Sequence, residues 1–192
     1  MLPSCCEIVA ALESDSPLDF EHPQVVERDA GPVEWRRIAG ILATIVFGVA
    51  LFDQIVKTAI VAWIGPDRPF QRWELAGRLV AFEYVENTGA AFGVFAGRVW
   101  LLSVLAVVVA LAFLVLFWRD LPRSTLLRTS VGLVLGGAIG NLLDRVRLGY
   151  VVDFMAVGVW PKFNIADSAI TIGLALLVFS AFQDSPPREN TS

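Results

Sequence analysis

The chain has 192 residues, of which 56% are hydrophobic and only 18% are charged. A soluble domain is about 45–50% apolar and about 25% charged. With a mean hydropathy of +0.64, this composition excludes a disordered chain, a nucleic-acid-binding domain and an ordinary cytosolic enzyme, and it favours a polytopic membrane protein. The formal net charge of −4 arises near the N-terminus, since the residues up to Arg37 include eight acidic and three basic side chains.

Four apolar stretches follow one another along the chain, each close to the roughly 20 residues that a helix needs to cross a bilayer. They cover about 38–64, 99–118, 126–143 and 165–182. Residues 1–37 are polar and acidic and are predicted to form an N-terminal tail, and residues 183–192 a short C-terminal tail. The sequence therefore predicts a mainly α-helical integral membrane domain over 38–182 with four transmembrane helices.

Two segments between the spans have the composition of strands. Residues 78–86 and 149–154 are rich in β-branched and aromatic side chains. They connect the first span to the second and the third span to the fourth. We expect them to form a small β-sheet that lies against one surface of the membrane.

Polar residues occur near the ends of the spans. An ionisable group at the centre of a membrane span costs about 2.5–3.5 kcal/mol on insertion scales, so such groups need an explanation. Three pairs have the spacing of neighbours on one helix face: Asp53 with Lys57, Asn141 with Asp144, and Asn164 with Asp167. Because consecutive spans alternate in direction, the end of the first span, the end of the third and the start of the fourth lie on the same side. The two strand-like segments, which end near Asn87 and contain Asp153, lie there too, so a single shared site is predicted.

Each cluster also has a structural explanation that involves no chemistry. Asp53 with Lys57 is explained as an ion pair, and Asn164 with Asp167 as a helix N-cap. Asp144 with Arg145 is explained as a charge pair at headgroup level, and Asp153 as a solvated loop acid. Close helix packing explains the glycines of the third span, which are Gly132, Gly136, Gly137 and Gly140. The convergence of the clusters on one side favours a functional site over independent structural roles.

The residue types at this site point to paired carboxylates. The only histidine is His22, in the tail, so a Ser-His-Asp or Cys-His arrangement is excluded, and no Cys/His cluster is available for zinc. Two neighbouring aspartates share a proton: the ionised one takes a proton from water while the protonated one donates to a carbonyl oxygen. We expect no metal and no cofactor. The residues alone leave Asp144 and Asp153 as alternative partners of Asp167, although Arg145 beside Asp144 favours an ionised Asp144.

Five motifs occur in order along the chain. They are Asp53-Gln-Ile-Val-Lys57, Asn87-Thr-Gly-Ala-Ala-Phe92, Gly136-Gly-Ala-Ile-Gly-Asn-Leu-Leu-Asp-Arg145, Val151-Val-Asp-Phe154 and Phe163-Asn-Ile-Ala-Asp167. Together they resemble the bacterial lipoprotein signal peptidases (signal peptidase II), and the likeness extends over all four spans. The N-terminal tail is longer than this family requires, and the connection from Asp153 to Asp167 looks short.

The resemblance implies a four-helix membrane aspartic endopeptidase that cuts prolipoproteins before their diacylglyceryl-modified cysteine. It implies Asp153 and Asp167 as the catalytic dyad, and it implies a flap-like loop beside the sheet on the outer side. The residues that it implies for positioning substrate and dyad are Asn87, Asn141, Arg145 and Asn164, with Asp53, Lys57 and Asp144 in support.

The resemblance also implies an environment and partners. The protein would be a multi-pass protein of the bacterial inner membrane with both termini in the cytoplasm and its site near the outer leaflet. Counting basic residues cannot supply this orientation, because the two sides hold seven each. We expect prolipoproteins, membrane lipid and globomycin-type inhibitors as partners, no nucleic acid, and a monomer. The alternative is a small transporter or channel subunit with a polar cluster at one membrane face.

Overall fold

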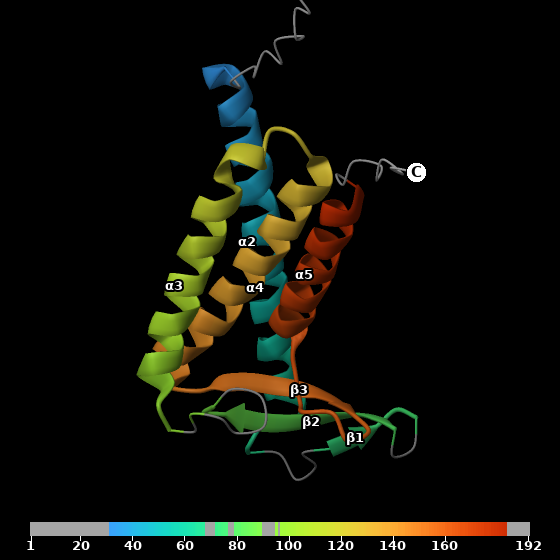
Figure 1. Ribbon diagram of the computed structural model, residues 1–192. Coiled ribbons are helices and arrows are strands. Elements are labelled where there is room, and N and C mark those ends of the chain that lie inside the picture. Colours follow the sequence, from blue (N-terminus) through green and yellow to red (C-terminus); the bar gives the residue numbers. More distant parts are fainter. Residues whose placement is uncertain (1–30, 68–71, 77–78, 90–94, 96, 184–192) are drawn as a thin grey trace, which may run out of the picture.

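The computed structural model describes residues 31–67, 72–76, 79–89, 95 and 97–183. The elements in this part of the chain are α2 (Pro32–Ile64), β1 (Arg72–Glu74), β2 (Val80–Asn87), α3 (Val99–Phe117), the 3-10 turn η2 (Trp118–Asp120), α4 (Thr125–Leu148), β3 (Val151–Val157) and α5 (Ile165–Gln183). The helices form a bundle, and the sheet lies across one end of it (Figure 1). The first turn of α2 and the end of α5 lie at the opposite end (Figure 1).

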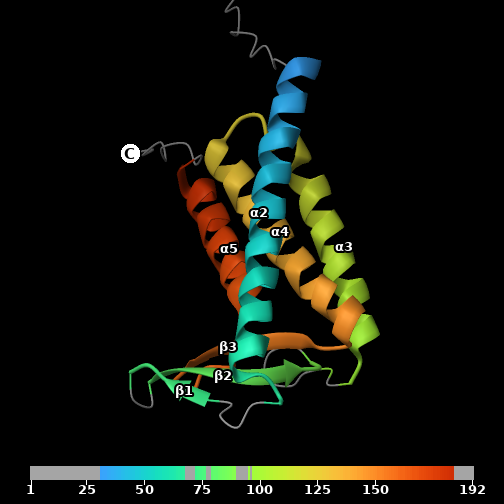
Figure 2. The ribbon, with the colours of Figure 1, turned by 180° about the vertical axis from the view of Figure 1, so that it is seen from behind.

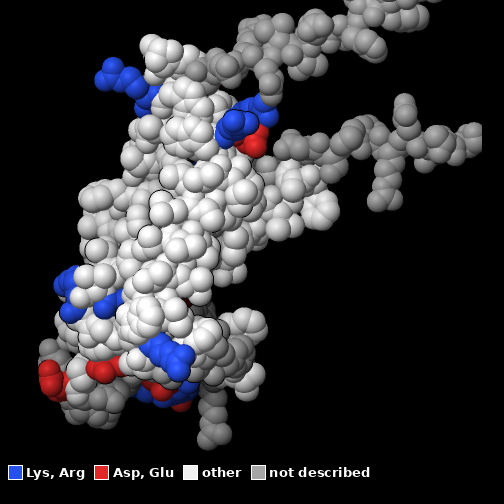
Figure 3. All heavy atoms as spheres, turned by 60° about the vertical axis from the view of Figure 1, so that its left-hand side comes forward, with Lys and Arg blue, Asp and Glu red and all other residues white. Residues whose placement is uncertain are grey.

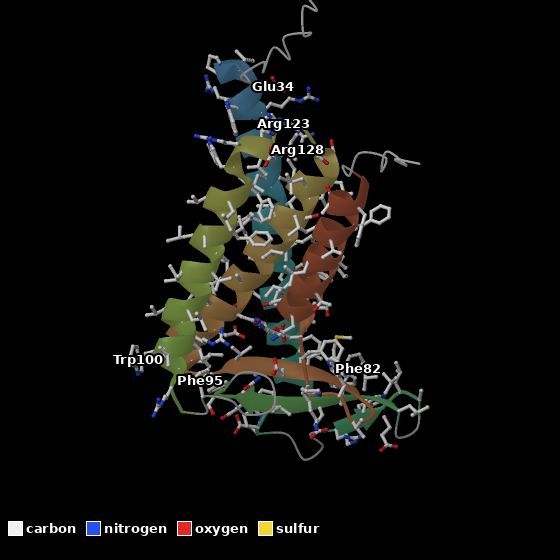
Figure 4. All side chains as sticks on the ribbon, viewed as in Figure 1. Glu34, Phe82, Phe95, Trp100, Arg123 and Arg128 are labelled. Atoms are coloured by element: carbon white, nitrogen blue, oxygen red, sulfur yellow. The ribbon has the colours of Figure 1, made fainter. Side chains whose placement is uncertain are left out.

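Four helices among the described residues are long and apolar enough to cross a membrane. On the face shown in Figure 3, charged side chains gather at the two ends of the bundle and leave a broad uncharged band between them. Figure 4 places Arg123, Arg128 and Glu34 at one end and Phe95 and Trp100 at the end beside the sheet. The predicted fold class, a four-span membrane protein with a small sheet, is therefore confirmed.

The ends of the elements differ in part from the predicted ones. Helix α2 begins at Pro32 rather than near residue 38. Hydropathy locates only the apolar part of a helix, whereas the polar first turns of α2 begin at a proline, a residue that suits the first position of a helix. Helix α4 likewise continues beyond residue 143 to Leu148, where Gly149 adopts a φ of 81° and its N–H caps the carbonyl of Arg145. The predicted tails outside 31–183 and most of the flap-like loop (90–94 and 96) lie outside the described residues.

The sheet is antiparallel with the order β1-β2-β3. The short strand β1 was not predicted, since three residues are too few to show a pattern. Strand β2 pairs with β3 through Phe82 with Met155 and Val85 with Asp153, so one extra residue of β2 lies between these pairs. Such a bulge twists a strand and changes the direction of the side chains beyond it. The bulge thus lies just before Asn87, at the end of β2 that reaches the site.

Helix α4 is the centre of the bundle and contacts α2, α3 and α5 (Figures 1 and 2). Its glycines make the close approach possible, as predicted: a Cβ at Gly136 would meet Val49 at 2.7 Å, and one at Gly137 would meet the carbonyl oxygen of Ala166 at 2.4 Å. Gly132 and Gly140 face Ile45 and Asp53 in the same way. The contact at Gly137 joins α4 to the first turn of α5.

We predict that Gly137→Ala lowers the melting temperature in detergent, because the new methyl group forces α4 away from α5 and overpacking of this kind costs about 1–3 kcal/mol. Gly40→Ala is the matched control, since it makes the same change in α2 where no atom lies within 4 Å of the new Cβ. Thermal unfolding followed by circular dichroism compares the two variants. Equal melting temperatures would show that the close approach at Gly137 contributes nothing to stability.

Candidate active site

The residues that the sequence singled out lie together where the helices meet the sheet. They come from five elements: Asp53 and Lys57 in the C-terminal half of α2, Asn87 at the end of β2, Asn141, Asp144 and Arg145 in the C-terminal half of α4, Asp153 in β3, and Asn164 and Asp167 at the start of α5. Hydrogen bonds or ion pairs connect all of them except Arg145, which lines the same cavity as Asp153 and Asp167.

Lys57 is the centre of the buried part of this network. Its Nζ lies 2.8 Å from Oδ2 of Asp53 and 2.8 Å from Oδ2 of Asp144, and it donates to Oδ1 of Asn141 at 3.0 Å. The lysine is 3% exposed. A charge removed from water is tolerated only when it is paired and hydrogen-bonded, and these three acceptors fulfil that condition.

The two carboxylates beside Lys57 use their remaining hydrogen-bonding capacity to hold backbone. Asp53 accepts from the N–H of Ala166 at 2.9 Å through Oδ1, and Asp144 accepts from the N–H of Val152 at 3.1 Å through Oδ2. Helix α5 and strand β3 are thereby fixed relative to α2 and α4. Asp144 forms its ion pair with Lys57 rather than with Arg145, because consecutive helical residues do not face each other, and Arg145 acts on Asp144 only through its charge.

Asn141 connects Lys57 to Asp167. An ammonium group can only donate hydrogen bonds, so Lys57 requires the oxygen of the Asn141 amide. That choice turns the Nδ2 of Asn141 toward Asp167, to whose Oδ1 it donates at 2.7 Å. Lys57, together with Asn164, whose Nδ2 donates to the same oxygen at 3.0 Å, therefore determines which end of the amide faces the carboxylate.

Asn164 is both a helix cap and a site residue. Its Oδ1 accepts from the N–H of Asp167 at 2.9 Å while Oδ2 of Asp167 accepts from the N–H of Asn164 at 3.2 Å, which is a reciprocal capping box. Because its oxygen is used in this way, its Nδ2 is free to donate to Oδ1 of Asp153 at 2.7 Å and to Oδ1 of Asn141 at 3.0 Å. The predicted N-cap and the predicted site contact thus coexist in one side chain.

Asn87 contacts Asp153 from the other side. Its Oδ1 accepts from the N–H of Gly89 at 2.9 Å, and this local turn leaves Nδ2 to donate to Oδ2 of Asp153 at 2.8 Å. Each oxygen of Asp153 therefore receives one amide donor. Asp153 is 1% exposed, so the interpretation of this residue as a solvated loop acid is wrong.

The electrostatic environment of Asp153 favours its protonated form. Burial and the neighbouring charge of Asp167 raise the pKa of Asp153 to about 7, against the opposing effect of the hydrogen bonds from Asn87 and Asn164. A group with this pKa changes its charge near neutral pH. Such a value suits a carboxyl group that donates and recovers a proton in each reaction cycle.

Asp153 and Asp167 line one cavity of about 1080 Å³. Strand β2 and the residues around Lys162 border it, and most of its other walls are apolar side chains of α3, α4 and α5, including Leu105, Val134 and Ile170. The Arg145 guanidinium also lines this cavity and interacts electrostatically with both aspartates. The cavity therefore combines two coupled carboxyl groups with walls that suit an apolar chain.

Gln54 is a member of the network that the sequence argument did not select. Its Nε2 donates to Oδ1 of Asp144 at 2.9 Å, and its Oε1 accepts from Nη1 of Arg147 at 3.1 Å. A polar amide inside an apolar span was the available signal. Within the described part of the chain, no group of three His, Cys, Asp or Glu side chains is placed to hold a metal ion.

Comparison with known proteins gives a consistent result. A family model described as signal peptidase (SPase) II matches residues 45–183. The chain is 40% identical over 139 residues to a lipoprotein signal peptidase of Halothermothrix orenii, covering 72% of this chain and 93% of that protein. It is 46% identical over 145 residues to a lipoprotein signal peptidase of Rhodococcus jostii, covering 72% of this chain and 71% of that protein.

A solved structure described as a bacterial membrane enzyme has a TM-score of 0.68 to this chain at 28% identity, covering 80% of this chain and 94% of the other. The matched region of the family model includes all five motifs and every residue of the network. These findings confirm the resemblance seen in the motifs. The chain belongs to the signal peptidase II family.

Proposed function

We propose that Asp153 and Asp167 are the catalytic dyad with which this aspartic endopeptidase removes signal peptides from prolipoproteins, cutting before the diacylglyceryl-modified cysteine. The observation that carries the assignment is the shared cavity, into which both carboxyl groups project while Asn87, Asn141 and Asn164 hold them. Asp144 is not part of the dyad in this proposal, because it is paired with Lys57 and lies outside the cavity lining.

The dyad divides the proton transfers of peptide hydrolysis. Asp167 takes the negative charge, supported by the Asn141 amide and by its place in the first turn of α5. It accepts a proton from a water molecule as the water oxygen attacks the scissile carbonyl carbon, and Asp153 donates its proton to the carbonyl oxygen. When the C–N bond breaks, the amine leaves with the proton held by Asp167, and Asp153 regains its proton from the hydroxyl group on carbon.

The walls of the cavity suit a substrate that remains in the bilayer. The apolar faces of α3 and α5 border the cavity, so a lipid-modified peptide enters without crossing water. Arg145 lies beside the dyad and positions the peptide through its planar donor groups. The alternative, a transporter or channel subunit, is not favoured, because a transport path needs polar residues through the full depth and α3 is apolar along its whole length.

The location of the protein follows from the same proposal. The start of α2 and the end of α5 both lie at the end of the bundle away from the sheet (Figure 1). We place those termini in the cytoplasm and the sheet and dyad near the outer leaflet of a bacterial inner membrane. The enzyme acts as a monomer in surrounding lipid, and globomycin-type inhibitors bind by occupying the cavity.

We predict that Asp153→Asn and Asp167→Asn each reduce kcat for a lipid-modified prolipoprotein at least about 10³-fold, because each removes one proton-transfer group. Asp144→Asn retains measurable cleavage. Purified variants are compared by mass spectrometry of the released signal peptide, with the melting temperature as a check on folding. Near-normal cleavage by either dyad variant would remove that residue from the dyad.

The pKa of Asp153 predicts the alkaline side of the pH profile. Asp153 donates a proton, so activity is present below pH 7 and falls as the pH rises through about 7 and the group ionises. Asn87→Ala removes a hydrogen bond that lowers this pKa, and the alkaline limb then moves to higher pH. A kcat/KM profile of both proteins is the measurement, and a rate that increases through pH 7 would assign Asp153 as the base instead.

Lys57 acts as a positioning residue through Asn141. We predict that Lys57→Met destabilises the protein by about 3–5 kcal/mol, since it leaves Asp53 and Asp144 buried without their cation. The double variant Lys57→Met/Asp144→Asn restores the original net charge of the cluster and recovers part of the melting temperature. Its cleavage rate stays low, because only Asn164 then donates to the Asn141 oxygen and the amide is held less firmly toward Asp167. A double variant less stable than Lys57→Met would contradict this role.

A further inference from the structure

The segment between β3 and α5 joins the two aspartates and is held at several points. Phe163 pairs with Met155, the N–H of Met155 donating to the Phe163 carbonyl at 2.8 Å. Gly158, at a φ of 52°, donates its N–H to the Leu79 carbonyl at 2.8 Å, and the N–H of Trp160 donates to the Val157 carbonyl at 2.9 Å. The backbone that carries Trp160 is therefore fixed both to β2 and within the segment itself.

The Trp160 side chain is at the border of the cavity that holds the dyad. It lines this cavity and is nevertheless 67% exposed, next to the fully exposed Val159. Its indole N–H has no hydrogen-bond partner among the residues that the structure describes. Tryptophan is enriched at membrane interfaces because its ring is apolar and its N–H requires a polar partner.

Three other short polar side chains of the cavity wall are already used by the fold. The hydroxyl group of Ser168 donates to the Asn164 carbonyl, and that of Thr171 donates to the Asp167 carbonyl, each at 2.9 Å. Asn87 is engaged by Gly89 and Asp153. The Trp160 N–H is thus a donor at the cavity that the fold leaves open for a ligand.

We propose that Trp160 recognises the diacylglyceryl group of the substrate, with its ring against the glyceryl unit and its N–H donating to an ester carbonyl. This inference rests on the proposed function. The glyceryl unit is joined through a thioether to the cysteine that follows the scissile bond, so its esters are carried by the same residue that supplies the leaving amine. Within a bilayer, apolar contact alone hardly favours the acyl chains of the substrate over surrounding lipid, since lipid is as apolar as a hydrophobic side chain. A hydrogen bond to a carbonyl group, in contrast, recognises the ester itself.

The test compares Trp160→Phe with the wild type on two synthetic lipopeptides. One carries a dipalmitoyl diester, and the other carries the matching dialkyl ether, which lacks both carbonyl groups. A neutral hydrogen bond is worth about 0.5–1.5 kcal/mol, or roughly 2–10-fold in affinity. We expect Trp160→Phe to raise KM for the diester by that factor with kcat unchanged, and to leave KM for the ether unchanged.

Trp73→Phe is the matched control, because Trp73 is also exposed, lies on β1 and does not line the cavity. We expect it to change neither KM. An equal effect of Trp160→Phe on both substrates, or no effect on either, would overturn the proposal. Failure of the proposed function looks different, since the wild type would then cleave neither lipopeptide.

Discussion

The buried ion cluster of Lys57 with Asp53 and Asp144 is the interaction on which the rest of the site depends. A lysine inside a membrane span must be paired, and its two carboxylate partners in turn hold the backbone of α5 and β3. Those two elements carry the aspartates that line the cavity. The need to pair one buried cation thus fixes the relative placement of three helices and strand β3.

The structural and chemical explanations of these residues prove to be compatible. The predicted ion pair of Asp53 with Lys57 exists, and so does the predicted cap of α5 by Asn164. Each of these contacts uses one side of a side chain and determines what its other side can do. In Asn164 the cap occupies the oxygen, so the nitrogen is left for Asp153. A site built from helix caps is rigid because unfolding the site would also uncap the helix.

Hydropathy and alternation predicted much of this arrangement, since span length and direction are set by the bilayer rather than by detailed packing. They could not distinguish Asp144 from Asp153, because that distinction depends on which carboxylate Lys57 contacts, and a contact between α2 and α4 leaves no periodic signal. The bulge in β2 also leaves no periodic signal, and strand β1 is too short to show a pattern. Gln54 was missed although its polar amide inside an apolar span was a signal. The resemblance to a known family supplied the choice of Asp153 that the residues alone left open.

The glycines of α4 connect membrane packing to the chemistry. Gly137 lets α4 approach the carbonyl of Ala166 in the first turn of α5, and one turn further along the same helix Asn141 reaches Asp167 at 2.7 Å. The adjoining face of α4 lines the cavity with Val134, Asn141 and Arg145. Small residues in this helix therefore do more than stabilise the bundle: the helix separation that they permit sets whether an amide can reach a carboxylate. A helix pair held only by large apolar side chains would leave the two groups too far apart to interact.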